Sequence, residues 1–332
     1  MTASVRARPK SALRAPWQFS KRPQYDRGVS AATAIETTGL AKTYHGTVRA
    51  LVGLDLAVAR GEVFGYLGPN GAGKSTTIRL LLGLIQPTAG RATIFGRDVH
   101  SDGVAARREV GYLPGDLRLS DRLTGREQLD SLARLRGGVD TALRNSLCER
   151  LQVDLGRPIR QLSKGNRQKV GIVQAFMHRP DLVVLDEPTS GLDPLLQTEV
   201  RALLQETAAE GRSVFISSHS LDEVQHVADR VGIIRGGRLV DVDAVDSLRE
   251  RSLRHVTVTF PNAPDAAAFT GIDGVRVVEA SDTSLKLSCP ESAMSALVKR
   301  IAEHDIVDLV SQPADLEEIF LELYRQVDGD GS

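Results

Sequence analysis

The fold is decided by one stretch, Gly68-Pro69-Asn70-Gly71-Ala72-Gly73-Lys74-Ser75-Thr76. It fits the phosphate-loop pattern G-x-x-x-x-G-K-[ST] and lies between an apolar run at 63–67, which predicts a buried strand, and an apolar-faced segment at 77–84, which predicts a helix. There the glycines let backbone N–H groups surround phosphate oxygens, and the helix adds its positive end. An ordinary strand-to-helix turn with a capping serine is the alternative. The full pattern predicts a bound nucleoside triphosphate, with Lys74 at the outer phosphates and the Ser75 hydroxyl on magnesium.

The composition is ordinary for a soluble globular protein, with 41% hydrophobic and 25% charged residues among 332. No run approaches the ~18 apolar residues that cross a bilayer, so a membrane role would need a separate partner. The first thirty residues lack the apolar segment of a secretory signal. Cys148 and Cys289 are far apart in the sequence and are expected to be reduced, structural thiols.

The net charge of zero conceals an uneven distribution. Residues 1–30 carry a balance of +6, which leaves −6 for the remainder. A mildly acidic folded part argues against nucleic acid as the main ligand. Residues 1–33 lack hydrophobic periodicity, so we expect a disordered basic extension, either an unstructured leader or a contact for anionic lipid headgroups.

Strands and helices are predicted to alternate from residue 34 to residue 243, which indicates an α/β fold with a doubly wound sheet and ligands at the carboxyl ends of its strands. A helical stretch at 125–152 indicates a helical subdomain, at about 98–178, inserted after the phosphate loop. From residue 250 the pattern restarts. Residues 250–326 predict a small accessory α+β domain, with a ferredoxin-like arrangement as one possibility and a final helix at 316–325.

A second chemical motif follows the apolar run at 182–185, which predicts a buried parallel strand. The strand ends in Asp186 and Glu187. Asp186 is placed to hold the magnesium that Ser75 binds, and Glu187 to act as the base that orients and polarises water at the γ-phosphate. Two adjacent acids could instead cap a helix, but a phosphate loop upstream in the same sheet favours the catalytic interpretation.

Four further pieces stand in a fixed order around these two motifs: Tyr44, Leu162-Ser163-Lys164-Gly165-Asn166, Ser190-Gly191-Leu192-Asp193, and His219. The six together resemble the motifs of ABC-type ATPases, the nucleotide-binding subunits of ABC transporters, over about residues 34–240. The tail at 315–321 is similar to the end of the accessory domain in ATPases of multidrug-type bacterial exporters. The resemblance implies a phosphate-loop NTPase fold of ABC type.

The resemblance also implies a role for each matched residue. ATP would be held by the phosphate loop of one chain, while Ser163 and Gly165 of a second chain close on it, so the active unit would be a homodimer or a paired ATPase. Asp193 would lie at this interface, and His219 would contact the γ-phosphate. Tyr44 would stack on adenine, although an isolated aromatic residue could equally belong to the core.

The function implied is that of the ATP-hydrolysing subunit of an exporter. It would sit peripherally on the cytoplasmic face of the cell membrane and drive transport through a separate transmembrane permease subunit by ATP-dependent dimer closure. No nucleic-acid partner is expected. The transported substrate cannot be deduced, because its contacts would lie in the permease.

Two departures from the family pattern stand out. Lys164 occupies a position where the family has glycine, and Asn166 one where it often has glutamine. After the strand at 110–113 the family places a glutamine that contacts magnesium, whereas this chain has Pro114-Gly115-Asp116. A water-mediated contact from Asp116 is one hypothesis for its replacement.

Two other classes of function compete with an exporter. ABC ATPases of DNA repair insert long coiled coils between the phosphate loop and the signature, but here only 87 residues separate Ser75 from Leu162. Relatives that act on ribosomes carry two cassettes in one chain, and this chain has one. Another phosphate-loop enzyme, such as a kinase, would not explain residues 162–166.

Overall fold

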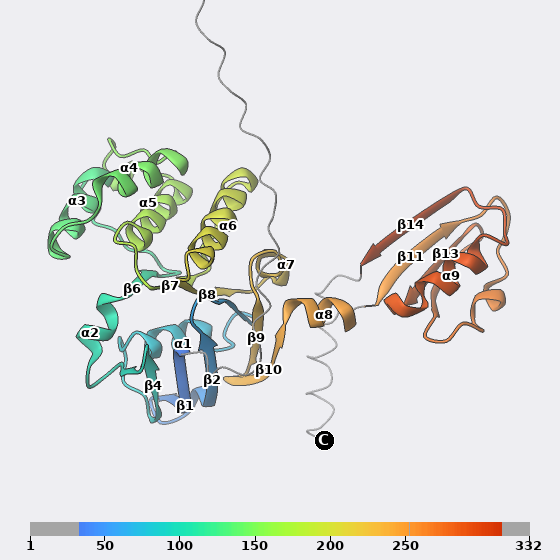
Figure 1. Ribbon diagram of the computed structural model, residues 1–332, viewed down its shortest axis with the longest axis horizontal. Helices are drawn as coiled ribbons and strands as arrows, with labels where there is room; N and C mark the ends of the chain where they lie inside the picture. The colour runs from blue at the N-terminus through green and yellow to red at the C-terminus, as the bar shows by residue number, and fades with distance from the viewer. Residues whose placement is uncertain (1–32, 252, 314–332) are drawn as a thin grey trace, which may run out of the picture. The chain divides into compact units, whose positions relative to one another are not determined.

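The computed structural model describes residues 33–313, apart from residue 252. Its central element is a six-stranded sheet in which β10 pairs antiparallel with β9 and the other neighbours are parallel (Figure 1). In spatial order the strands are β10 (Arg238–Ala244), β9 (Arg230–Arg235), β3 (Val63–Leu67), β8 (Ser213–Ser218), β7 (Leu182–Asp186) and β6 (Val110–Leu113). The parallel strands end at one edge, which therefore carries the phosphate loop and the acidic motif.

Both faces of this sheet are buried. Along β3, Val63 and Leu67 enter one hydrophobic core, while Phe64 and Tyr66 enter another. This is why β3 and β7 read as continuous apolar runs rather than as alternating strands. The ring of Tyr66 packs 5.3 Å from that of Phe215 on β8, and such tilted pairs add to the stability gained by burial.

Helices cover the first face, where Val63 and Leu67 point. They are α3 (Gly125–Leu135), α4 (Thr141–Arg150), α5 (Lys164–Phe176), α6 (Pro194–Ala209), α7 (Leu221–Gln225) and α8 (Val245–Arg251), with a short 3-10 turn at Ile159–Gln161. The opposite face packs on α1 (Lys74–Leu81), α2 (Gly103–Arg108) and an antiparallel sheet of β2 (Val48–Ala59), β1 (Thr33–Tyr44), β4 (Ala89–Ile94) and β5 (Arg97–Asp98). Sheet and helices together bear out the α/β phosphate-loop fold class.

The helical stretch predicted at 125–152 consists of two helices, α3 and α4. Gly137 and Gly138 adopt φ of +84° and +112°, which ends α3. The Asp140 carboxylate then accepts hydrogen bonds from the next turn and caps α4. At the start of α3, Thr124 and Glu127 form a capping box. The apolar positions used for the prediction, Leu129, Leu132 and Leu135, all precede this break, so their spacing could not reveal it.

Residues 254–313 form a second, four-stranded antiparallel sheet with its own hydrophobic core. In spatial order it contains β12 (Arg276–Ala280), β13 (Ser284–Cys289), β11 (Arg254–Thr259) and β14 (Asp308–Pro313), with α9 (Met294–Ile301) and 3-10 turns at Ala266–Phe269 and Glu291–Ala293. This order matches a ferredoxin-like sheet, except that the 3-10 turn at 266–269 replaces the first helix. The final helix expected at 316–325 lies outside the described residues, and the division into domains stays a prediction.

Two smaller observations bear on the expectations from composition. The thiols of Cys148 and Cys289 are both buried and free, and burial raises the pKa of each. Across the described ranges, no helix combines the length and the apolar content that a membrane span requires.

Candidate nucleotide-binding site

The phosphate loop connects β3 to α1 as predicted. Gly73 precedes the helix with φ of +113°, a conformation that side-chain-bearing residues rarely adopt, and Gly71 has φ of +82°. Pro69, Asn70 and Gly71 are exposed, as is Ser75 on the first turn of α1. The loop therefore presents a helix start and free backbone to solvent, which is the arrangement that binds phosphate.

Lys74 is buried beneath this loop, with 6% of its side chain exposed. Its Nζ donates to the carbonyl oxygen of Gly68 at 2.6 Å and to that of Pro69 at 3.3 Å. Burial lowers the pKa of Lys74, and the carboxylates of Glu187 and Asp186 oppose that shift. An anion at the loop would further favour the charged amine, so the site is electrostatically suited to phosphate.

Asp186 ends β7 as a buried carboxylate. Strand β8 lies between β3 and β7, so the acidic strand is not the immediate neighbour of the phosphate-loop strand. Ser217 on β8 contacts the acidic strand directly, because its hydroxyl donates to Asp186 Oδ1 at 2.5 Å. Ser217 could not be identified from the sequence, since a serine in an apolar strand carries no motif of its own.

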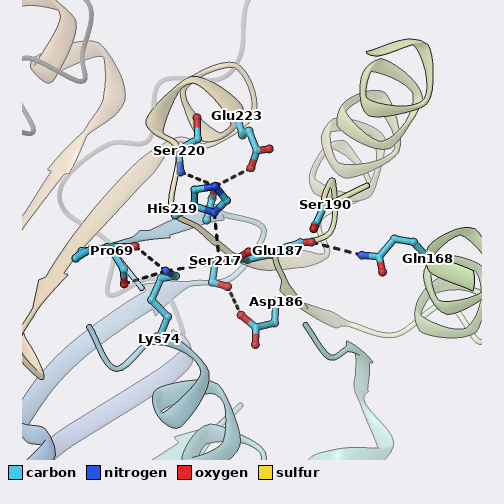
Figure 2. Close-up of polar contacts among 12 residues, drawn as sticks. Pro69, Lys74, Gln168, Asp186, Glu187, Ser190, Ser217, His219, Ser220 and Glu223 are labelled. Carbon is cyan, nitrogen blue, oxygen red and sulfur yellow. Dashed lines mark hydrogen bonds and ion pairs between the residues drawn. The ribbon is translucent and has the colours of Figure 1, made fainter. Parts of the chain in front are cut away.

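Glu187 extends from the end of β7 toward the lysine, as Figure 2 shows. Its Oε1 lies 3.7 Å from Lys74 Nζ and 3.4 Å from His219 Nδ1. His219 follows β8 in a turn that is held by Ser218, whose hydroxyl donates to Glu223 and accepts from the backbone N–H of Ser220. The structure thus brings together Lys74, Glu187 and His219, which come from three separate motifs; we call these three side chains the acid–base cluster.

The other predicted residues lie at helix starts. Ser163 caps α5, and its hydroxyl accepts from the Asn166 N–H at 3.2 Å. Asp193 caps α6 in the same way, accepting from the N–H of Leu196 at 3.1 Å. Both positions are exposed, and within residues 33–313 neither side chain bonds to the acid–base cluster. Inside one chain, each serves its own helix.

Tyr44 ends β1 and is half-buried. The ammonium of Lys42 lies 5.2 Å from the centre of its ring, a cation–π contact that leaves the tyrosine at the end of its strand. The stacking role for Tyr44 stays a prediction.

The two departures from the family pattern have defined contacts. Lys164 Nζ donates to the Ser190 hydroxyl at 3.2 Å, so this lysine joins the start of α5 to the turn after Glu187. Asp116 is exposed, and its Oδ2 accepts from the Arg118 guanidinium at 3.0 and 3.1 Å. The neighbouring Gly115 packs on Asp186, because a Cβ there would stand 3.1 Å from Asp186 Oδ2. The loop after β6 therefore reaches the Asp186 carboxylate through a glycine.

A phosphate cradle, a buried lysine and two adjacent acids at the end of one parallel strand define a phosphate-loop nucleoside triphosphatase. Comparison with known proteins then narrows the class. The family model described as ABC transporter matches residues 51–190. The bacitracin transport ATP-binding protein of Bacillus licheniformis is 37% identical over 68% of this chain and 74% of its own length. The daunorubicin/doxorubicin resistance ATP-binding protein of Streptomyces peucetius is 35% identical over 87% of this chain and 92% of its own.

The chain belongs to the ABC transporter family. A solved structure of an ATP-binding subunit of an ABC transporter is 32% identical and superposes with a TM-score of 0.61, covering 65% of this chain and 92% of that one. A dimeric bacterial ABC transporter cassette shares the fold at 22% identity and a TM-score of 0.59, over 64% of this chain. The protein is an ATP-binding and ATP-hydrolysing subunit of an ABC exporter, as the motifs predicted.

Proposed function

We propose that this subunit hydrolyses magnesium-bound ATP at the site described above, with Glu187 as the base. The observation that carries this assignment is the acid–base cluster: Glu187 Oε1 is within 3.7 Å of a buried lysine and 3.4 Å of His219 at the mouth of the phosphate loop. In this arrangement Lys74 binds the outer phosphates and Glu187 accepts a proton from the attacking water. His219 stabilises the charge that develops on the γ-phosphate.

The donor set at the loop fits magnesium. Asp186 offers a buried carboxylate whose orientation is fixed by the hydrogen bond from Ser217. Ser75 offers an exposed hydroxyl at the start of α1. Magnesium prefers such oxygen ligands and takes the rest from phosphate and water. When bound, the metal would neutralise charge on the phosphates; the protein's share is to hold Asp186 and Ser75 in place.

We further propose that two copies pair across two nucleotides. Ser163, Gly165 and Asp193 stand at exposed helix starts and do not reach the acid–base cluster of their own chain. An exposed helix start whose capping hydroxyl can still donate its proton is an anion site that a second chain's ATP could fill. A structural relative is described as a dimeric cassette, which supports the pairing.

The membrane partner is proposed as a separate permease subunit, with this chain bound peripherally at the cytoplasmic face. The relatives named for bacitracin transport and daunorubicin resistance support an exporter of this arrangement. Closure of the paired subunits on ATP, and opening after hydrolysis, would drive the permease between its states.

A mixing experiment tests the site and the pairing together. Glu187→Gln removes the base. Ser163→Asp keeps a good helix cap, because aspartate caps as well as serine, but it places a negative charge where the partner's triphosphate would lie. Each variant alone should hydrolyse ATP poorly.

In a mixed pair, one composite site carries both changes and the other carries neither. Mixing equal amounts should therefore restore roughly a quarter of wild-type activity, since half of the pairs are mixed and half of their sites are intact. Wild-type protein mixed with either variant calibrates subunit exchange. If exchange occurs and activity does not return, the paired site is wrong.

A further inference from the structure

Helix α5 lies against the turn that follows Glu187, at three consecutive points. Gly165 packs so closely that a Cβ on it would come within 2.8 Å of the Gly191 carbonyl oxygen. Lys164 donates to the Ser190 hydroxyl. One turn further along the helix, Gln168 reaches the backbone at 187–188. Residues 164, 165 and 168 share one face of the helix, so α5 and residues 187–191 form a continuous contact.

Gln168 makes the innermost of these contacts, and Figure 2 shows its amide directed from α5 to the turn. Its Nε2 donates to the carbonyl oxygen of Pro188 at 3.0 Å and, at the longer distance of 3.4 Å, to that of Glu187. Only 6% of the side chain is exposed. A buried amide that donates to two successive carbonyls fixes both peptide units, because leaving them without a donor in a buried site is unfavourable.

The residue that this contact holds is under backbone strain. Glu187 has φ of +51°, a left-handed conformation that is rare for a residue with a side chain, and it precedes a proline, which restricts its backbone further. Two other hydrogen bonds support it: its N–H donates to the Ser217 carbonyl at 3.1 Å, and its carbonyl accepts from the Ser190 N–H at 3.2 Å. Strained conformations persist only where several surrounding contacts hold them in place. Gln168 is the side chain that supplies such a contact from α5.

We propose that Gln168 is a positioning residue for hydrolysis: it holds Glu187 in its left-handed conformation and thereby ties the base to the helix that Ser163 begins. The inference rests on the proposed role of Glu187. A rigid helix capped at one end by Ser163 and bonded at its fifth residue to the backbone of the base would align the carboxylate in its own site as the cap engages the partner's ATP. Gln168 bonds to the backbone of residues 187–188 and not to the carboxylate of Glu187, so its action on the reaction is indirect.

The test is Gln168→Met, which keeps an unbranched side chain of similar length and removes the amide donor. We expect kcat for ATP hydrolysis to fall about tenfold to a hundredfold, as misplacement of a catalytic group does, while the KM for ATP stays within twofold. Gln174→Met is the matched control: it makes the same change on the same helix, at a glutamine whose buried Oε1 has no partner among the described residues, and it should leave both constants unchanged.

A double variant separates positioning from general structural damage. If Gln168 acts only through Glu187, adding Gln168→Met to Glu187→Gln should cause no further loss in single-turnover hydrolysis. An equal fold-loss in both backgrounds, an unchanged kcat in Gln168→Met, or an equal loss in the Gln174 control would overturn the inference.

The outcomes also distinguish this inference from the proposed function. If Glu187→Gln alone hydrolyses ATP normally, the base assignment fails, and the inference fails with it. If Glu187→Gln is impaired but the losses multiply, only the role of Gln168 fails. Should Gln168→Met not fold, Gln168→Ala, which also removes the amide donor and buries no charge, takes its place in every arm.

Discussion

Replacing Glu187 with glutamine should change ATP binding and ATP hydrolysis in opposite directions. The amide has the shape of the carboxylate, so the contact with His219 Nδ1, now 3.4 Å long, can persist. The change removes one negative charge that lies 3.7 Å from Lys74 Nζ. Hydrolysis loses its base, while the phosphate that Lys74 binds loses a repulsive neighbour.

The two magnitudes follow from the site. Losing a general base typically costs about 10²–10⁴ in rate. For binding, two unit charges ~4 Å apart interact by about 1 kcal/mol when water screens them fully, and by more in a drier site. Glu187 is 28% exposed, so water still screens its charge, and we use the screened value of about 1 kcal/mol instead of the larger value for a dry site. We therefore expect kcat to fall at least a hundredfold and ATP affinity to rise by about fivefold, the equivalent of 1 kcal/mol.

Both quantities can be measured on the same preparation. Titration with ATP and magnesium at a temperature where turnover is negligible gives the affinity, and phosphate release gives kcat. Size-exclusion chromatography with ATP should also reveal a long-lived pair in the variant. Normal phosphate release would refute the assignment of Glu187 as base, and weaker ATP binding would show that its carboxylate supports the nucleotide instead of repelling its charge.

Three other predictions concern separate parts of the chain. Lys74→Ala should abolish ATP binding or turnover, because it removes the buried cation under the loop; binding is measured by nucleotide titration. His178 has its pKa lowered to about 4 by burial, with Arg136 adding to the shift. Below about pH 6.5 the imidazole of the unfolded chain binds a proton that the folded chain does not bind. The contribution of the neutral His178 to the free energy of unfolding is therefore fully present above pH 6.5 and falls by on the order of 3 kcal/mol toward pH 4. Denaturant titrations of wild type and His178→Leu across that window should show a steeper loss of stability in the wild type, and equal slopes would contradict the prediction. Deleting residues 1–30 should leave the ATPase rate intact, and a large loss would contradict an unstructured leader.

The parts of the fold that the sequence predicted are those whose signal is local. Buried parallel strands leave apolar runs, and the runs at 63–67 and 182–185 became β3 and β7. Two helices were missed, α2 (Gly103–Arg108) and α8 (Val245–Arg251), because six or seven residues give too few turns for a periodicity. Strand order could not be predicted either: the insertion of β8 between β3 and β7 depends on chain segments more than a hundred residues apart.

The residues of the candidate site also fall into two groups, those with a local sequence signal and those whose role depends on tertiary packing. The phosphate loop could be recognised because its chemistry is carried by neighbouring backbone groups in one turn. Ser217 and Gln168 could not, since each acts on a residue that tertiary packing brings near: Ser217 on Asp186 across two strands, and Gln168 on the carbonyls of Glu187 and Pro188. A glutamine in a helix or a serine in a strand is otherwise unremarkable, and only contacts reveal such residues.

The loop after β6 departs from the family pattern, and the contacts of Gly115 and Asp116 show what each residue can do there. Gly115 stands against the Asp186 carboxylate and has no side chain with which to bind a metal. Asp116 has the chemistry to do so, but its carboxylate accepts two hydrogen bonds from Arg118 and is exposed. For Asp116 to act through water, it would have to leave that guanidinium, although an exposed ion pair of this kind is worth only about 0–1 kcal/mol and would not prevent the move. Packing at Gly115 is therefore the stronger constraint, because a side chain there would press on the buried carboxylate of Asp186. Asp116, in contrast, can be replaced if Asp186 and the phosphates supply the metal ligands.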